Sequence, residues 1–194
     1  TAFDAVTSGI QNTAIGANSM TANTSGTNNT AVGRSSLATN VSGIELTAVG
    51  TNALSLNTGS YNTAVGSAAL VSNTTANYNT AVGYQAGYDN TTGVIDAFGA
   101  SALANNTTGN YNTAIGGSTL FDNTTGSNNV AIGRNALENN TTASYSTAVG
   151  YQALYNNTTG GSNDSFGANS LYQNTTGTLN AAFGNGALNA NTTG

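Results

Sequence analysis

The sequence of 194 residues contains no cysteine, proline, histidine or tryptophan, and its only cations are Arg34 and Arg134. Without cysteine the chain forms neither disulfides nor thiolate metal sites, so its composition does not indicate a redox compartment. Without histidine, cysteine, lysine or paired carboxylates it offers no catalytic constellation, and it has no Asp-rich calcium repeat. We therefore expect no enzyme activity, no metal site and no cofactor.

Charge is equally scarce, at 5% of residues and a net value of −5. Two arginines a hundred residues apart make no basic patch, which argues against nucleic acid as a partner. No apolar run approaches the roughly 20 residues of a membrane span, and no signal peptide is visible. The seven acids are scattered along the chain: Asp4, Glu45, Asp89, Asp96, Asp122, Glu138 and Asp164.

What is present is a repeat. A glycine closes each Ala-Val-Gly-like triplet, and successive glycines are 17 residues apart except for two spacings of 16. A unit this short cannot bury a face alone and must stack on its neighbours, so residues 1–194 are expected to form one solenoid array. We call these residues the corner glycines: Gly16, Gly33, Gly50, Gly66, Gly83, Gly99, Gly116, Gly133, Gly150, Gly167 and Gly184.

Each unit reads as one coil of an all-β parallel β-solenoid. Residues 29–33, Asn-Thr-Ala-Val-Gly, indicate a short strand, and a second strand is expected around Ser36 and Leu37. Residues 106–109, Asn-Thr-Thr-Gly, are typical of a turn. About eleven and a half coils, stacked about 4.8 Å apart, would form a rod on the order of 55 Å long. The two 16-residue units are expected to lose a residue in a turn and to keep strand register.

Leucine stands four residues after the corner glycine in nine of eleven units, and Phe3 falls in the same column near the start of the chain. The residue before the glycine is always Val, Ile or Phe, and we expect these side chains to form a continuous buried spine. The predicted spine consists of Val32, Val49, Val65, Val82, Phe98, Ile115, Ile132, Val149, Phe166 and Phe183.

Asparagine stands seven residues after every corner glycine and is expected to form a hydrogen-bonded ladder along one turn. Ten of these asparagines begin a glycosylation sequon, but a glycan on every coil, about 4.8 Å apart, would crowd severely, so the ladder is the favoured interpretation. The predicted ladder is Asn23, Asn40, Asn57, Asn73, Asn90, Asn106, Asn123, Asn140, Asn157, Asn174 and Asn191.

Two further columns carry candidate surfaces. A threonine column could order water on an ice-binding face, although each strand supplies one threonine where that function wants two. Tyrosines could stack on sugar rings or pack against another chain, and we favour packing. The threonines are Thr13, Thr30, Thr47, Thr63, Thr80, Thr113 and Thr147, and the tyrosines are Tyr61, Tyr78, Tyr84, Tyr111, Tyr145 and Tyr151.

Adjacent strand residues face opposite sides, so one apolar column should lie outside and form a stripe that another copy covers. The stripe would contain Ala81 and Ala114 or, with the opposite phase, Val82 and Ile115. Both ends of the sequence stop inside a unit without a capping coil, which is expected of an excerpt from a longer array or of copies stacked end to end.

Residues 128–136, Asn-Asn-Val-Ala-Ile-Gly-Arg-Asn-Ala, resemble the Asn-Ser-Val-Ala-Ile-Gly-x-x-Ser motif of trimeric autotransporter adhesin heads of the Yersinia adhesin type. Matching positions recur along essentially the whole chain, and related repeats look like those of phage tail fibres. The resemblance implies a left-handed parallel β-roll, three chains wound side by side, and adhesion to host matrix or surfaces. The family's repeat is usually shorter, so the Asn-Thr-Thr-Gly turn looks like an insertion.

Three functions are consistent with these features. The first is an adhesive or structural fibre segment at a cell or virion surface, either a homotrimeric adhesin head or a phage fibre shaft. The second is an extracellular filament that assembles from copies of itself without a specific receptor. The third is an ice-binding solenoid.

Overall fold

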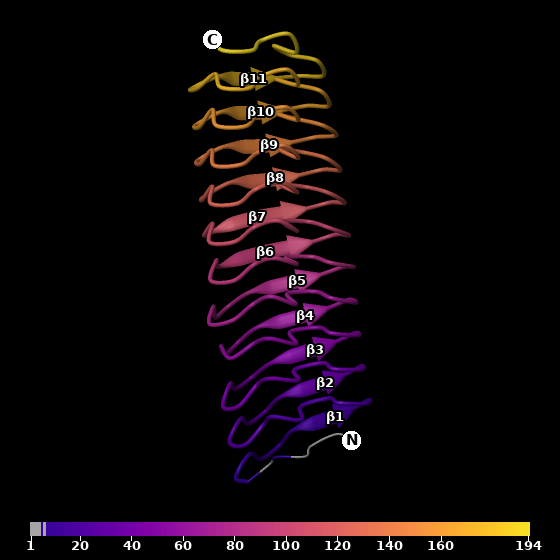
Figure 1. The fold of residues 1–194 in the computed structure, drawn as a ribbon. Coiled ribbons are helices and arrows are strands. Elements are labelled where there is room, and N and C mark those ends of the chain that lie inside the picture. Colours follow the sequence, from indigo (N-terminus) through magenta and orange to yellow (C-terminus); the bar gives the residue numbers. More distant parts are fainter. Residues whose placement is uncertain (1–4, 6) are drawn as a thin grey trace.

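The computed structural model describes residue 5 and residues 7–194 and shows an all-β parallel solenoid with one strand in each coil (Figure 1). Phe3 lies outside the described residues. One parallel sheet contains all eleven strands in sequence order, over about ten turns of about 17 residues. The strands are β1 (Thr13–Ile15), β2 (Thr30–Val32), β3 (Thr47–Val49), β4 (Thr63–Val65), β5 (Thr80–Val82), β6 (Ile95–Phe98), β7 (Asn112–Ile115), β8 (Val130–Ile132), β9 (Thr147–Val149), β10 (Asp164–Phe166) and β11 (Ala181–Phe183).

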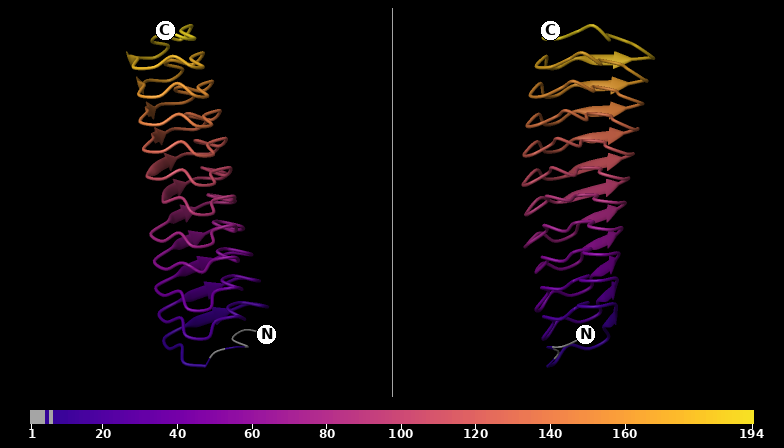
Figure 2. Two further views of the ribbon diagram at one scale, coloured as in Figure 1. Left: turned by 60° about the vertical axis from the view of Figure 1, so that its left-hand side comes forward. Right: turned by 45° about the vertical axis from the view of Figure 1, so that its right-hand side comes forward.

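The coils form a straight rod, with the first and last coils at opposite ends (Figure 2). Equivalent residues stack on one another along the whole array, as in the pairing of Ala14 with Ala31. The strands stay aligned across the two 16-residue units, where Ala48 pairs with Ala64 and Ala81 with Ala97. The prediction of a parallel β-solenoid with constant strand register is therefore confirmed.

The side chains that point into the interior are those of the residue next to the predicted spine, and the spine residues themselves point outward. The residue two before the corner glycine is buried in β2 to β11, as Ala31, Ala64 and Ala114 show, whereas the following Val, Ile or Phe points outward. Seven of the ten predicted spine residues are exposed by 36–70%: Val49, Val65, Val82, Phe98, Ile115, Ile132 and Phe183. The other three are half-buried: Val32, Val149 and Phe166. The prediction of a buried spine is wrong for the single chain, because the interior behind the sheet accommodates alanine while the leucine column fills the rest.

The expected second strand around Ser36 and Leu37 is a turn segment instead. Leu37 has a φ of 48°, and every described leucine or methionine of its column is also left-handed. Such a backbone costs an L-residue roughly 1–2 kcal/mol, and burial of the leucine side chain, worth about 1.5–3 kcal/mol, offsets it. Neighbouring coils are still joined by backbone hydrogen bonds in this turn segment, since the Leu37 amide donates to the Ala53 carbonyl at 3.1 Å.

The corner glycine ends the strand where two coils approach closely. At Gly66 the φ is +140°, and a Cβ atom would lie 2.3 Å from the carbonyl oxygen of Gly83 in the next coil. No side chain fits at that distance, and L-residues rarely adopt that φ. The recurring glycine thus marks the corner where the chain leaves the sheet and enters the leucine segment.

Candidate functional site

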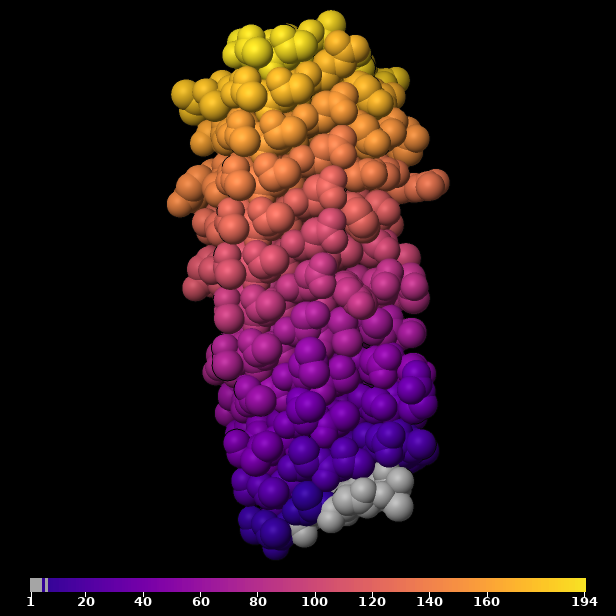
Figure 3. All heavy atoms as spheres, in the orientation of Figure 1, coloured from indigo at the N-terminus to yellow at the C-terminus, as the bar shows by residue number. Residues whose placement is uncertain are grey.

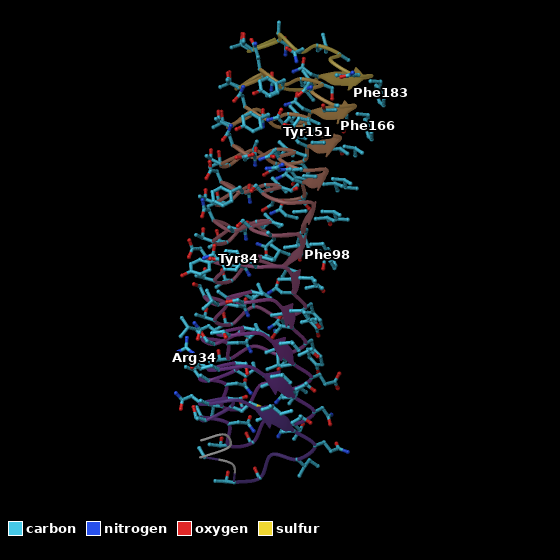
Figure 4. All side chains as sticks on the ribbon, turned by 90° about the vertical axis from the view of Figure 1, so that its right-hand side faces the viewer. Arg34, Tyr84, Phe98, Tyr151, Phe166 and Phe183 are labelled. Carbon is cyan, nitrogen blue, oxygen red and sulfur yellow. The ribbon has the colours of Figure 1, made fainter. Side chains whose placement is uncertain are left out.

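The sheet turns one flat side outward, and we call it the strand face. It is made by the residues five, three and one before each corner glycine, which point away from the interior while the residues between them are buried in the coils of β2 to β10. The last of these columns is apolar in every coil. Figure 4 shows three of its members, Phe98, Phe166 and Phe183, projecting from the same edge of the rod.

The middle column of the strand face consists mainly of threonines whose side chains are half-buried, Thr13 being exposed. Four coils break this row, with Asp96, Val130, Asp164 and Ala181. The strand face carries three acids, Asp96, Asp164 and Glu45, and no cation among the described residues. Its chemistry is therefore apolar and hydroxyl-rich, with isolated negative charges.

The third column of the strand face lies where each strand begins, and it holds the exposed tyrosines Tyr61, Tyr78, Tyr111 and Tyr145. Tyr61 and Tyr78 stack with ring centroids 5.0 Å apart and planes 2° from parallel. The structure places Tyr84 and Tyr151 elsewhere: they follow the corner glycine, and Figure 4 shows them on a different side of the rod from the labelled phenylalanines. The six predicted tyrosines thus form two surfaces.

The predicted asparagine ladder is confirmed. Its described members are fully buried, apart from the half-buried Asn191. Nine of the ten neighbouring pairs are joined by a bond from Nδ2 of one asparagine to Oδ1 of the previous one, at 2.7–3.3 Å. In the remaining pair, Asn57 donates to the Gly59 carbonyl at 2.8 Å instead. A glycan on one of these buried amides would break its ladder bonds, so the folded array has no place for the sequon glycosylation considered above.

A second asparagine ladder runs beside the first, and the sequence interpretation missed it. Its side-chain oxygens accept the backbone amide one coil on, as Asn112 Oδ1 does from Asn129 at 3.0 Å. The signal was present, because asparagine stands four before the corner glycine in eight of eleven units; the exceptions are Leu46, Ile95 and Ser146.

The two ladders converge on shared carbonyl groups. The Gly126 carbonyl accepts from Asn123 of the first ladder at 3.0 Å and from Asn112 of the second at 2.7 Å. Every buried side-chain nitrogen and oxygen among the described residues has a hydrogen-bond partner. This closed network fixes the coil cross-section and holds the strand face in register.

One acidic residue in the segment that follows the corner glycine, Glu138, has a shifted pKa. Burial and the nearby Asp122 carboxylate raise the pKa of Glu138, and Arg134 partly opposes them. Glu138 in turn raises the pKa of Tyr155, whose ring stacks on Tyr172 with centroids 5.2 Å apart. Asn135 donates to Glu138. These groups form a polar surface cluster without a cavity.

Within the part of the chain that the structure describes, no pocket is present and no three metal-binding side chains come together. The described residues also include no helix long and apolar enough to cross a bilayer. The space-filling view in Figure 3 shows a closely packed rod surface on the side it presents. The broad strand face is thus the main candidate for interaction.

Comparison with known proteins adds no family or relative. No protein-family model, curated protein or solved structure matches the chain.

Proposed function

We propose that the chain is a segment of an extracellular structural fibre, at a cell or virion surface, whose copies associate side by side through the strand face. The observation that carries this proposal is the continuous outward column of Val, Ile and Phe. Exposed apolar stripes of this extent are typical of protein-protein contacts.

The size of the strand face supports a second copy as its occupant. Four residue steps of about 3.3 Å give a width of about 13 Å, and ten coil spacings of about 4.8 Å give a length of about 48 Å. The face, with its apolar and polar columns together, therefore covers roughly 600 Å² by these spacings. Two such faces would bury about 1,200 Å² together, which reaches the range of stable interfaces. Two copies whose strand faces meet satisfy this requirement, a homotrimer would divide each face between two neighbours, and a lateral filament would use a second contact surface on each copy.

Sedimentation velocity of the purified chain tests the proposal, with light scattering to obtain the mass. We expect an oligomer, and we expect the double variant Val82→Lys, Ile115→Lys to dissociate, because the new charges would lose their hydration at the interface. Thr92→Lys with Thr125→Lys places the same charges on exposed sites in the same two coils, outside the strand face, and should leave the mass unchanged. A well-folded wild-type monomer would contradict side-by-side association.

An ice-binding solenoid is the second candidate, and the threonine row favours it. Thr30, Thr47 and Thr63 occupy equivalent positions in successive strands, each with a valine two residues on that faces the same side. Asp96 and Phe98 interrupt the regular array in its middle. Measurable thermal hysteresis by a monomeric wild-type chain, abolished in Thr63→Lys, would favour ice binding over the fibre.

In a more specific version of the fibre proposal the fibre also binds a host surface, and the tyrosines outside the strand face are the candidate contacts. Tyr84 and Tyr151 remain exposed beside the corner glycines and are accessible when strand faces pair. Their rings could stack on sugar rings of a host surface. Binding of the oligomer to an array of glycans, lost in Tyr84→Ala with Tyr151→Ala but kept in Thr92→Ala with Thr159→Ala, would separate an adhesin from a filament without a receptor.

A further inference from the structure

The regularity of the strand face leaves the alignment of two copies open. Moving one copy by a coil, about 4.8 Å, sets threonine where threonine was and valine where valine was over much of the face. A fibre with one structure needs residues that break this repeat and select a register. This inference rests on the side-by-side association proposed above.

Residue size follows a pattern across the strand face from β4 to β10, and β11 departs from it by combining Leu179 with Phe183. Phe98 and Phe166, at the ends of their strands, occur in coils that begin with the small residues Val94 and Ser162. The coils that begin with tyrosine end in Val or Ile. In chain order the first residues are Tyr61, Tyr78, Val94, Tyr111, Asn128, Tyr145, Ser162 and Leu179, and the last residues are Val65, Val82, Phe98, Ile115, Ile132, Val149, Phe166 and Phe183.

Contact between the first and last residues within one chain does not explain this size match, although Phe166 also stacks on Phe183 of the same chain with ring centroids 4.9 Å apart. The two columns are four residue steps apart in an extended segment, a separation of about 13 Å, with the middle column between them. Val94 is half-buried and lies between Tyr78 and Tyr111, which are 67% and 69% exposed. We call the position over Val94, where a small half-buried side chain lies between two exposed rings, the recess at β6.

We propose that Phe98 of one copy enters the recess over Val94 of a parallel neighbouring copy at the same height, and that Phe166 does the same over Ser162. When two rods point the same way and their strand faces meet, the column of last residues opposes the column of first residues. Antiparallel rods would instead bring each column against itself.

The two phenylalanine coils, β6 and β10, are four coils apart. A shift of four coils brings one of these phenylalanines against the other's recess and leaves the second match unmade, whereas shifts of one or five coils bring only Phe183 against Ser162 or Val94. A parallel alignment without displacement satisfies both matches.

The absence of cysteine allows a direct test, because single-cysteine variants cross-link at one site only. The reporters lie in the coil of β4 and in the coil of β1, away from the phenylalanines: chains with Val65→Cys are mixed and co-refolded with chains carrying Tyr61→Cys, in the same coil, or Gln11→Cys, at an exposed position three coils away. The cross-linker is a bismaleimide shorter than two coil spacings, about 9.6 Å. Sedimentation first establishes that each mixture forms oligomers.

We expect Val65→Cys to cross-link to Tyr61→Cys at least about tenfold more than to Gln11→Cys, which corresponds to about 1.4 kcal/mol between registers. In chains that also carry Phe98→Val and Phe166→Val, the oligomer mass should persist while this preference disappears. Thr92→Val with Thr159→Val, outside the strand face, should leave the preference unchanged.

Equal cross-linking of both pairs in wild-type background would overturn the register proposal, and so would strongest cross-linking of Val65→Cys to itself, which indicates antiparallel copies. A preference that survives loss of both phenylalanines would also overturn it. In each of these cases the oligomer is intact, so side-by-side association stands. A monomeric wild-type chain would instead defeat the proposed function.

Discussion

Replacing Asn106 by alanine should destabilise the rod more than replacing Asn123, although both belong to the first ladder. Asn106 donates to Asn90 Oδ1 at 2.7 Å and to the Gly109 carbonyl at 3.1 Å, and it accepts from Asn123 at 2.7 Å. Asn123 likewise takes part in three bonds, with Asn106, the Gly126 carbonyl and Asn140. The two substitutions therefore remove the same number of hydrogen bonds.

The difference lies in the carbonyl that remains. After Asn123→Ala the Gly126 carbonyl keeps its bond from Asn112. The second ladder has Ile95 in the equivalent place beside Asn106, so Asn106 is the one side-chain donor to the Gly109 carbonyl among the described residues. A buried group without a partner costs about 1–3 kcal/mol. We expect Asn106→Ala to cost about 2–4 kcal/mol, roughly 1–2 kcal/mol more than Asn123→Ala.

Urea unfolding followed by circular dichroism measures both variants, with Thr108→Ala as an exposed control expected to stay within about 0.5 kcal/mol of wild type. The slope of the transition must be compared as well, since long repeat arrays can lose two-state behaviour. Equal destabilisation by Asn106→Ala and Asn123→Ala would refute the role assigned to the shared carbonyls. An unchanged midpoint for Asn106→Ala would remove the ladder as a stabilising element.

Three further changes test the interior, the strand face and the acidic cluster. Gly87→Leu and Ile95→Asn should each destabilise the rod, but the double variant should recover at least about 1 kcal/mol of their summed cost in denaturant unfolding. Asp96→Thr with Asp164→Thr should strengthen association in sedimentation, because it removes carboxylates that the interface would have to desolvate. Glu138→Gln should raise the melting temperature at neutral pH: the raised pKa of Glu138 means that its contribution to stability is most favourable when it is protonated and is lost as pH rises through its folded pKa. The gain should vanish as the pH falls below the ordinary glutamate pKa of 4.5, where Glu138 is protonated in both the folded and the unfolded chain, and a constant gain at every pH would exclude this cause.

The period, the parallel strands and the first ladder could be predicted from the sequence because stacked coils place equivalent residues on each other. A column that is constant in sequence, such as the one containing Asn106, becomes a column in space without further assumptions. The turn deletions could be located for the same reason, since the strands on either side must remain paired.

The phase of the strand could not be predicted by the same reasoning. A Thr-Ala-Val strand has apolar groups on both sides, and the larger valine seemed the better core residue. What decided the phase was the segment after Gly33, where left-handed residues direct Leu37 toward the sheet and leave room for Ala31 alone. Leucine disfavours that backbone intrinsically, so its propensity gave no sign of the turn.

Departures from the repeat show that side chains of neighbouring interior columns fill the same space, so a smaller residue in one column allows a larger one in the next. Gly87 replaces the column's leucine and leaves space, and in the next unit Ile95 replaces the second-ladder asparagine. A Cβ atom at position 87 would lie 2.8 Å from Ile95 Cδ1, so the isoleucine occupies the space of the missing leucine. The exchange removes one donor to the Gly109 carbonyl, which makes Asn106 more important in that coil than its equivalents elsewhere. A substitution in the leucine column therefore changes the hydrogen bonding of the next ladder step, and single-site effects in this rod depend on the coil in which they are made.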